Sequence, residues 1–370
     1  MRLLPALLLL PLFGVFSACN DKDGDTDTDV EGDADADADA DTDTDTDTDA
    51  DTDVGVGYTV ITEANPNAVM SIWMSDTSDV WLVGADGAGD PGGPFVAHYD
   101  GTAWTEYDPA MTGKLQWVWS DGGDTVVAVG ASGQVAWYTV STDTWRVEKI
   151  GVPNHTLWGV WGSAVDDLWA VAGDSFGYVN AAIYHYDGTA WTTAWEPGGA
   201  EQYEAYKVWG SAADDVWVVG SNELIVHWDG SAWTQVTAPQ DTNTMFTVHG
   251  SSADDVWAVG GFANGEAMHW DGSTWADADP PLQDIPPRFT GVFSHPTHGT
   301  VACGASGSLW WVDGAGAWSA DVNPPATVLG YHACWIDDAG GVWAVGGNID
   351  SQALDQGVVT YLGTETIAPL

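Results

Sequence analysis

Short runs of apolar residues alternate with polar turns along this chain, and the same order of runs recurs seven times. The clearest copy covers residues 208–234, where Val-Trp-Gly-Ser is followed by Asp-Asp-Val-Trp-Val-Val-Gly, His-Trp-Asp-Gly and Trp-Thr. Runs of apolar, β-branched and aromatic residues bounded by Gly, Asp and Ser are typical of short β-strands. Each copy therefore predicts a small sheet of three or four strands, and the repetition predicts a ring of such sheets.

The seven copies align on one position of their second predicted strand. This position holds Trp81, Val127, Trp169, Trp217, Trp257, Val301 and Trp343. The mean spacing of about 44 residues matches the length of a four-stranded propeller blade. Residues 58–370 therefore predict an all-β fold, a seven-bladed β-propeller with four antiparallel strands in each blade.

The two ends of the repeat region predict how the ring closes. Six copies carry a tryptophan in the fourth strand, whereas the seventh has Thr366 at that place. Residues 58–62, Tyr-Thr-Val-Ile-Thr, form a lone strand ahead of the first copy. We expect this strand to complete the last blade; the alternative is that residues 364–367 fill that place unaided.

The repeat resembles known propeller families. As in the kelch and galactose-oxidase-like (BNR-like) repeats, a glycine ends the second strand, an aromatic residue lies in the third and a Trp in the fourth, and Gly260, Trp270 and Trp275 show this order best. Over residues 71–362 the pattern is more similar to propeller repeats of predicted bacterial surface lipoproteins, most of unassigned function. The resemblance implies the fold only.

The N-terminus predicts export. A single positive charge is followed by an apolar run from Leu3 to Phe16, too short to span a membrane, and by small residues up to Cys19. We expect residues 1–18 to be a signal peptide. Residues 16–19 resemble a bacterial lipobox, which implies that Cys19 is lipidated and anchors the protein in a lipid bilayer; an ordinary secretory signal is the alternative. Asn20 after the cysteine implies, by the same resemblance, the outer membrane or cell surface.

Residues 19–57 predict a disordered, low-complexity acidic linker. From Asp21 to Asp53, Asp alternates with Thr or Ala, and these 33 residues hold 16 Asp and one Glu against one Lys. Such a segment repels itself and buries nothing, which favours a solvated spacer. The alternative is calcium binding through Asp21, Asp23 and Asp25, because calcium prefers carboxylate oxygens. We expect no other cofactor.

The propeller is acidic as well. Of the 55 acidic residues of the chain, 38 lie outside the linker, and the propeller has five basic residues to set against them: Lys114, Arg146, Lys149, Lys207 and Arg288. The resulting net charge of about −33 excludes binding of nucleic acid or an anionic membrane through a basic surface. We expect a monomer.

The polar residues that recur in each copy predict a scaffold role. One third-strand position holds His98, His185, His227 and His269, and one turn position holds the Asp pairs at 166–167, 214–215 and 254–255. Equivalent positions in different blades cannot converge on one substrate or ion, so we expect packing and hydrogen-bonding roles and no metal site. We predict no catalytic residue; a sialidase-type site resembles a cluster of three arginines, and the mature chain has two.

Cys303 and Cys334 fall in strands of adjacent predicted blades. A disulfide is possible in an exported protein, and two buried thiols are an equal alternative.

The residues that vary between copies lie in connections predicted to share one face. Connections from the second to the third strand, and from the fourth strand to the next blade, differ in length, and insertions on one face often mark a binding side. We therefore predict a non-catalytic module that binds an extracellular glycan, peptide or protein. The candidate contacts are Tyr107, Trp195, Glu196, Tyr203, Tyr206, Phe262, Asn264 and Arg288. The alternatives are a secreted carboxylate-dependent hydrolase or lyase acting on polysaccharide, and a purely structural envelope protein.

Overall fold

The computed structural model divides the chain into two units, residues 1–53 and 54–370. It describes residues 57–87, 92–174, 181–198, 203–239, 244–281, 285–323, 325–349 and 353–370. All of these described residues belong to the second unit. The predicted signal peptide, the predicted lipidation site Cys19 and the linker with Asp21, Asp23 and Asp25 lie outside the described residues.

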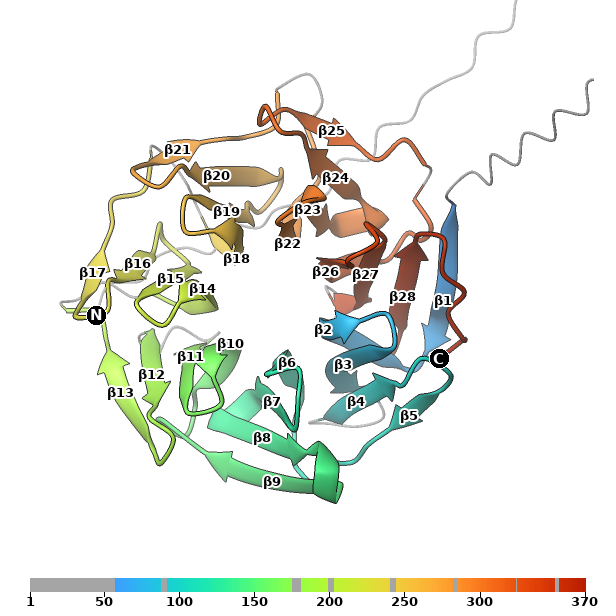
Figure 1. The fold of residues 1–370 in the computed structure, drawn as a ribbon, viewed down its shortest axis with the longest axis horizontal. Helices are drawn as coiled ribbons and strands as arrows, with labels where there is room; N and C mark the ends of the chain where they lie inside the picture. The colour runs from blue at the N-terminus through green and yellow to red at the C-terminus, as the bar shows by residue number, and fades with distance from the viewer. Residues whose placement is uncertain are drawn as a thin grey trace, which may run out of the picture. The chain divides into compact units, whose positions relative to one another are not determined.

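Seven four-stranded antiparallel sheets form a ring around a common axis, as Figure 1 shows. This confirms the predicted seven-bladed β-propeller. The innermost strands of blades 1 to 7 are β2 (Asn67–Asp76), β6 (Leu115–Ser120), β10 (Thr156–Ala164), β14 (Ala205–Ala212), β18 (Met245–Ser252), β22 (Phe289–His295) and β26 (Gly330–Ile336). The second strands are β3 (Asp79–Asp86), β7 (Thr125–Gly130), β11 (Asp167–Gly173), β15 (Asp215–Gly220), β19 (Asp255–Gly260), β23 (Gly299–Gly304) and β27 (Val342–Gly347).

The outer half of each blade is shorter. The third strands are β4 (Gly93–Tyr99), β8 (Gln134–Thr139), β12 (Ala182–Tyr186), β16 (Ile225–Trp228), β20 (Glu266–Trp270), β24 (Leu309–Val312) and β28 (Gly357–Leu362). The outermost strands are β5 (Trp104–Glu106), β9 (Thr144–Lys149), β13 (Trp191–Trp195), β17 (Trp233–Gln235), β21 (Trp275–Asp277), β25 (Trp318–Ala320) and β1 (Tyr58–Asn65). Single 3-10 turns, η1 (Ala131–Gly133), η2 (Val140–Thr142) and η4 (Ala305–Gly307), follow three of the strands. No helix of the described segments is long and apolar enough to cross a membrane.

The ring closes through its N-terminal strand. Strand β1 pairs antiparallel with β28, with Tyr58 opposite Leu362 and Val60 opposite Thr360, and so becomes the outermost strand of blade 7. This confirms the expectation that the lone N-terminal strand completes the last blade. The C-terminal tail packs elsewhere: the Trp104 Nε1–H donates a hydrogen bond of 3.0 Å to the carbonyl oxygen of Ala368.

Large aromatic side chains fill the wedges between neighbouring blades. Trp81, Trp217 and Trp343, all on second strands, are at most 2 % exposed. Trp81 of blade 1 packs with Leu115 and Val126 of blade 2. Each such ring removes ~150–250 Å² of surface from water, which is why tryptophan recurs at this position.

The repeated histidines and aspartates hold single blades together. In blade 1 the Asp79 carboxylate accepts hydrogen bonds from Ser75 Oγ at 2.8 Å and Trp81 Nε1 at 3.1 Å, and lies 2.8 Å from His98 Nε2. The same His–Asp pair recurs in blades 3, 4 and 5. The carboxylate lies between the serine and the histidine, whereas a catalytic triad needs the histidine in the middle. The network is a hydrogen-bonded scaffold.

Cys303 on β23 and Cys334 on β26 are both buried and carry free thiols. Burial first, and then a hydrogen bond with Cys334, raises the pKa of the Cys303 thiol. The structure therefore corresponds to the second of the two alternatives, a pair of buried thiols between blades 6 and 7.

Candidate functional site

Each innermost strand carries a β-bulge at the same place. In β14, Ala205 pairs with Gly220 and Lys207 pairs with Val219, so Tyr206 has no partner in the ladder. The same irregularity occurs at the equivalent position of all seven innermost strands. A bulge adds one residue to one strand and changes the direction of its side chain. Along the rest of each innermost strand, side chains alternate between the two faces of the blade and so point toward the neighbouring blades. The bulge interrupts this alternation at the bulged residue.

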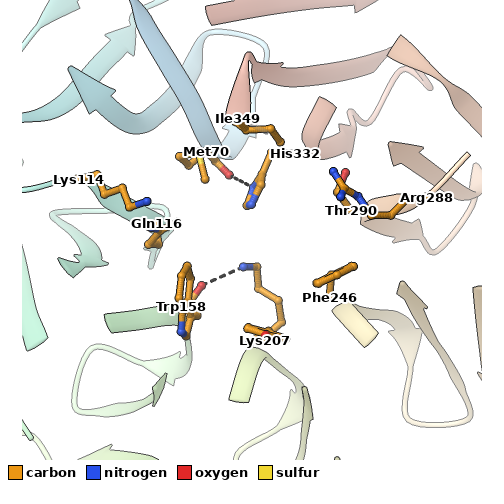
Figure 2. A pocket seen from close by; sticks show the side chains of 11 residues that line it. Met70, Lys114, Gln116, Trp158, Lys207, Phe246, Arg288, Thr290, His332 and Ile349 are labelled. Carbon is orange, nitrogen blue, oxygen red and sulfur yellow. Dashed lines mark hydrogen bonds between the residues drawn. The ribbon is translucent and has the colours of Figure 1, made fainter. Parts of the chain in front are cut away.

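The seven bulged residues line one pocket at the axis of the ring. They are Met70, Gln116, Trp158, Tyr206, Phe246, Thr290 and His332, and Lys114, Lys207, Arg288 and Ile349 complete the lining of a cavity of 290 Å³. Figure 2 shows these side chains around a common space. The scaffold positions repeat from blade to blade, whereas this position holds seven different residue types. The seven blades therefore differ most at the residues that face the pocket.

The pocket lies on the face that carries the variable connections. Lys114 and Arg288 belong to connections that lead from an outermost strand into the next blade. Ile349 belongs to the connection between β27 and β28. These are the two kinds of connection that the sequence predicts on the binding face.

Lys114 and Arg288 occupy equivalent positions, each two residues before a bulge. Their carbonyl oxygens accept hydrogen bonds of 3.0 Å from the backbone N–H groups of Ala131 and Ala305. Gly130 lies against the first of these carbonyls, where a Cβ would come within 2.2 Å of the Lys114 oxygen. Glycine at the end of β7 therefore allows the close approach that fixes the backbone of Lys114.

Lys207 follows the bulge of β14 and reaches toward blade 3 (Figure 2). Its Nζ donates a hydrogen bond of 2.9 Å to the carbonyl oxygen of Trp158 and lies 4.2 Å from the centroid of the Trp117 ring. The residue is 4 % exposed, and burial lowers the pKa of its amine to about 7. A carbonyl dipole and a ring face stabilise an ammonium group less than a carboxylate does.

His332, the bulged residue of β26, is held in one tautomer. Its Nδ1 lies 2.5 Å from the carbonyl oxygen of Met70, which only accepts, so Nδ1 carries the proton. Burial above all, together with the positive charges of Lys207, Lys114 and Arg288, lowers the pKa of His332 to about 3. The imidazole is therefore neutral at pH 7 and keeps Nε2 as an acceptor. The three cations and this ring line the same cavity.

Gln116 places an amide inside the pocket. The residue is fully buried, and neither Nε2 nor Oε1 has a hydrogen-bond partner among the described residues. A buried polar group without a partner costs about 1–3 kcal/mol. This cost is unexpected at a position that only has to close the channel.

Three adjacent blades contribute an aromatic wall. The rings of Trp158 and Tyr206 have centroids 5.9 Å apart, and those of Tyr206 and Phe246 are 5.7 Å apart. The exposed ring of Phe262 continues the series at 5.9 Å from Phe246. The hydroxyl of Tyr206 donates a hydrogen bond to the carboxylate of Glu204. Lys114 and Arg288 precede the blades on either side of this wall, and Lys207 lies on β14 within it, so the cations are distributed around the pocket.

Four of the eight contacts predicted from the sequence lie in or beside the pocket. Tyr206 and Arg288 line it, and Phe262 lies next to it. Asn264 forms a backbone bridge with Pro287, the residue before Arg288. The segment that carries this arginine is therefore held by the neighbouring loop.

The other four predicted contacts lie away from the pocket lining. Tyr107 packs against Trp81 between blades 1 and 2. Tyr203 is 9 % exposed and belongs, with the partly buried Trp195, to the core between blades 3 and 4. Glu196 is exposed just beyond β13.

Sequence reasoning missed most of the pocket. The bulged residues other than Tyr206 were not among the predicted contacts, nor were Lys114, Lys207 and Ile349. One signal was present in the aligned copies. The first strand of each copy carries one equivalent aromatic or histidine residue, and the residue three positions before it differs in every copy; these equivalent residues are Trp73, Trp119, Trp161, Trp209, His249, Phe293 and Trp335. That variation marks a position with no shared structural task.

The described lining of the pocket contains no Asp or Glu. These lining residues therefore offer no carboxylate for the alternative of a hydrolase or lyase that uses carboxylates near the channel. The described segments also hold no group of three or more His, Cys, Asp or Glu residues arranged for a metal ion.

Solved structures with the same fold are numerous. The WD40 β-propeller domain of Doa1 has a TM-score of 0.59 and 11% identity, covering 84% of this chain and 98% of that one. YCF48 from Cyanidioschyzon merolae has a TM-score of 0.61 and 16% identity, covering 84% and 100%. A catalytically inactive virginiamycin B lyase from Staphylococcus aureus with quinupristin has a TM-score of 0.62 and 12% identity, covering 83% and 100%.

No protein-family model matches the sequence, and no curated protein does. Identities this low show the fold alone. The structural neighbours include WD40 propellers and an enzyme, so the seven-bladed fold is compatible with a binding module and does not by itself separate binding from catalysis.

Proposed function

We propose that this protein is an exported, lipid-anchored binding module that holds an extracellular ligand in the channel pocket on its variable face. One observation carries the proposal: seven otherwise equivalent blades present seven different side chains to one cavity. A structural plug needs only apolar residues of suitable size. A set of different polar, cationic and aromatic groups is what selective binding requires.

The pocket also lowers the stability of the fold. Lys207 is a buried cation, and the amide of Gln116 is buried without a protein partner. Both features cost free energy of folding. Violations of this kind are expected at functional sites, where the binding of a ligand compensates them.

The predicted N-terminal elements support a role at a membrane surface. A lipid on Cys19 anchors the chain, and the acidic segment from Asp21 to Asp53 has a reach of roughly 110 Å when extended. The propeller is thereby held away from the bilayer. Its net charge of about −33 keeps it from lying on an anionic lipid surface.

Binding is tested with the mature chain carrying Cys19→Ser, which removes the predicted lipidation site. A thermal-shift screen of glycans, peptides and small metabolites identifies ligands, and calorimetry measures their affinity. Phe246→Ala should weaken a bound ligand at least tenfold, because it removes one ring of the wall. The matched control Trp195→Ala, on the same face but outside the pocket, should leave the affinity unchanged. Binding that depends on Trp195 and not on Phe246 would overturn the assignment of the pocket.

The anchor is tested in cells that express the full chain. The wild type should sediment with the membrane fraction and carry a lipid on its N-terminal peptide by mass spectrometry. Cys19→Ser should appear in the soluble fraction. A wild-type protein that is soluble and unmodified would contradict the anchor and leave the binding proposal in place.

A further inference from the structure

Cations gather in the pocket of a domain that has very few of them. The propeller has five basic residues against 38 acidic ones, and three of the five, Lys114, Lys207 and Arg288, line the cavity. The other two, Arg146 and Lys149, lie on the outermost strand β9. Exposed charges act over about 10 Å at 0.1 M salt, so a group inside the pocket responds mainly to the nearby cations and less to the acidic surface.

Lys207 is buried and Lys114 is half-buried, and neither has, within the part of the chain that the structure describes, the ion pair that usually accompanies a charge withdrawn from water. No carboxylate of the described segments forms an ion pair with Lys114 or Lys207. Arg146, by contrast, lies 3.4 Å from the carboxylate of Glu148. Burial without a counter-ion destabilises a fold, because the lost hydration is not replaced. A structural role does not explain why these two lysines lie in the cavity without a counter-ion among the described residues. A bound external anion would supply the missing counter-ion.

We propose that the pocket recognises a small organic carboxylate with an aromatic or apolar body. The carboxylate binds to the cations Lys114, Lys207 and Arg288 that line the cavity, and the body packs on the wall of Trp158, Tyr206 and Phe246. This inference rests on the proposed function and names the chemical class of its ligand.

The shape and polarity of the cavity select this class. Its volume of 290 Å³ is just below the usual range of ligand pockets, roughly 300–1,000 Å³, and so fits a small molecule. A guanidinium such as that of Arg288 binds the two oxygens of a carboxylate through parallel hydrogen bonds. The aromatic wall adds dispersion and stacking energy that an inorganic ion does not use.

The polar neighbours favour one negative charge over two. His332 is neutral and offers the Nε2 lone pair, and the buried amide of Gln116 offers both a donor and an acceptor. The carboxylate of Glu204, bonded to Tyr206, adds a negative charge beside the wall. A monoanion meets the donors at lower repulsion than a phosphate dianion does.

Calorimetry with matched probes tests the charge. Phenylacetate and indole-3-acetate are compared with phenylacetamide and indole-3-acetamide, and acetate and inorganic phosphate serve as anions without an aromatic body. The mature chain with Cys19→Ser is used. The aromatic carboxylates should bind at least tenfold more tightly than their amides and than either small anion.

Single charge removals locate the site. Lys114→Gln and Arg288→Gln should each weaken the aromatic carboxylates at least tenfold and leave the amides unchanged. The control Lys149→Gln removes an equal charge from an exposed position and should change nothing. Unfolding midpoints of all variants show whether a loss of binding is a loss of folding, and Gln116→Leu provides a second pocket variant that keeps every cation.

A carboxylate at the end of a peptide has the same chemistry as a free acid. N-acetylphenylalanine and its amide therefore form a further pair of probes. Tighter binding of N-acetylphenylalanine than of phenylacetate indicates a chain end as the ligand, and weaker binding indicates a small free acid. Both results support the carboxylate.

Three outcomes overturn this inference. Equal affinities for acids and amides show that the pocket does not discriminate between charged and neutral ligands; this result rejects the inference and is consistent with the proposed function. Absence of binding by every probe at millimolar concentration rejects the ligand class, while the thermal-shift screen still decides the proposed function. Binding of the acids that is unchanged by Lys114→Gln and Arg288→Gln places the site elsewhere and rejects both.

Discussion

Lys207 and Trp158 join two blades at the pocket: the lysine Nζ on β14 donates a hydrogen bond of 2.9 Å to the tryptophan carbonyl oxygen on β10. The carbonyl belongs to a bulged residue, so the ladder of blade 3 leaves it available to a neighbour. The same ammonium lies over the ring of Trp117 in blade 2. One side chain thus connects three blades, and its partners bring no full negative charge.

Replacing Lys207 by Met should raise the free energy of unfolding by roughly 1–3 kcal/mol at pH 7. The folded-state pKa of about 7 is below the ordinary 10.5, so folding penalises the charged amine. The penalty is complete below pH 7 and shrinks as the pH rises from 7 to 10.5. Urea unfolding should therefore show a larger gain at pH 6 than at pH 10.

An exposed lysine provides the control for the Lys207 prediction. Lys149→Met, at an exposed position, should leave the stability unchanged at both pH values. A Lys207→Met variant that is less stable than the wild type would mean that its contacts with Trp158 and Trp117 outweigh the burial of its charge.

The affinity for phenylacetate should be constant below pH 7 and should fall above it, by up to tenfold per pH unit. A bound anion raises the pKa of Lys207 above its free value of about 7. Below pH 7 the amine is already charged, and above pH 7 binding has to take up a proton. Calorimetry at pH 8 in two buffers of different ionisation enthalpy should measure an uptake of up to one proton.

The other titratable groups around the pocket respond to pH in different ways, and Lys114 is the one whose lowered pKa acts in the same direction as that of Lys207. Burial lowers the pKa of His332 to about 3, so its ring stays neutral over this range. Burial raises the pKa values of both Tyr206 and Glu204 and lowers that of Lys114. Lys207→Met should remove the decline between pH 7 and 8; persistence of the decline would assign it to another of these groups.

Asp79→Asn should lower the free energy of unfolding by about 1–2 kcal/mol at pH 7 and leave ligand affinity unchanged. The hydrogen bond from His98 is the largest influence that lowers the pKa of the Asp79 carboxyl. A carboxyl with a lowered folded-state pKa stabilises the fold above its ordinary pKa of 3.8, and this stabilisation is lost as the pH falls through the folded value. Wild type and variant should therefore converge in acid unfolding curves. A change in affinity would give the scaffold network a role in the pocket.

Removal of β1 should open the ring. A chain that begins at Gly57 keeps every described strand and should unfold at the same urea concentration as the mature protein. A chain that begins at Asn67 lacks the partner of β28 and exposes an unpaired edge, so it should unfold at lower urea or self-associate. Equal midpoints for the two truncated chains would show that β28 does not need its neighbour.

The fold was predictable because each blade is a local pattern. Alternating apolar strands, the glycine that ends the second strand and the fourth-strand tryptophan lie within one copy of the repeat, and seven copies determine the size of the ring. Even the role of β1 followed from Thr366, which stands where the other copies have tryptophan. The repeated histidines were predicted to have packing and hydrogen-bonding roles, because equivalent positions in different blades cannot meet at one point.

The candidate site was predictable only in part. The variable face was inferred from the lengths of connections, and Tyr206 and Arg288 were named on that basis. The aromatic residues that were named with them, Tyr107 and Tyr203, pack between blades, because a ring beside a loop contributes most by filling a wedge. An aromatic residue in a predicted connection can line the pocket or pack between two blades, and the sequence pattern does not distinguish the two positions.

The sequence by itself determined the repeat, the number of blades and the scarcity of basic residues. Only the tertiary structure decided that Lys114, Lys207 and Arg288 share one cavity with His332 and Gln116. The bulge that turns Gln116 and His332 toward the axis depends on the register between paired strands, and the proximity of all five side chains depends on closure of the ring. Closure brings together segments far apart in the chain, so no single copy of the repeat encodes the cavity.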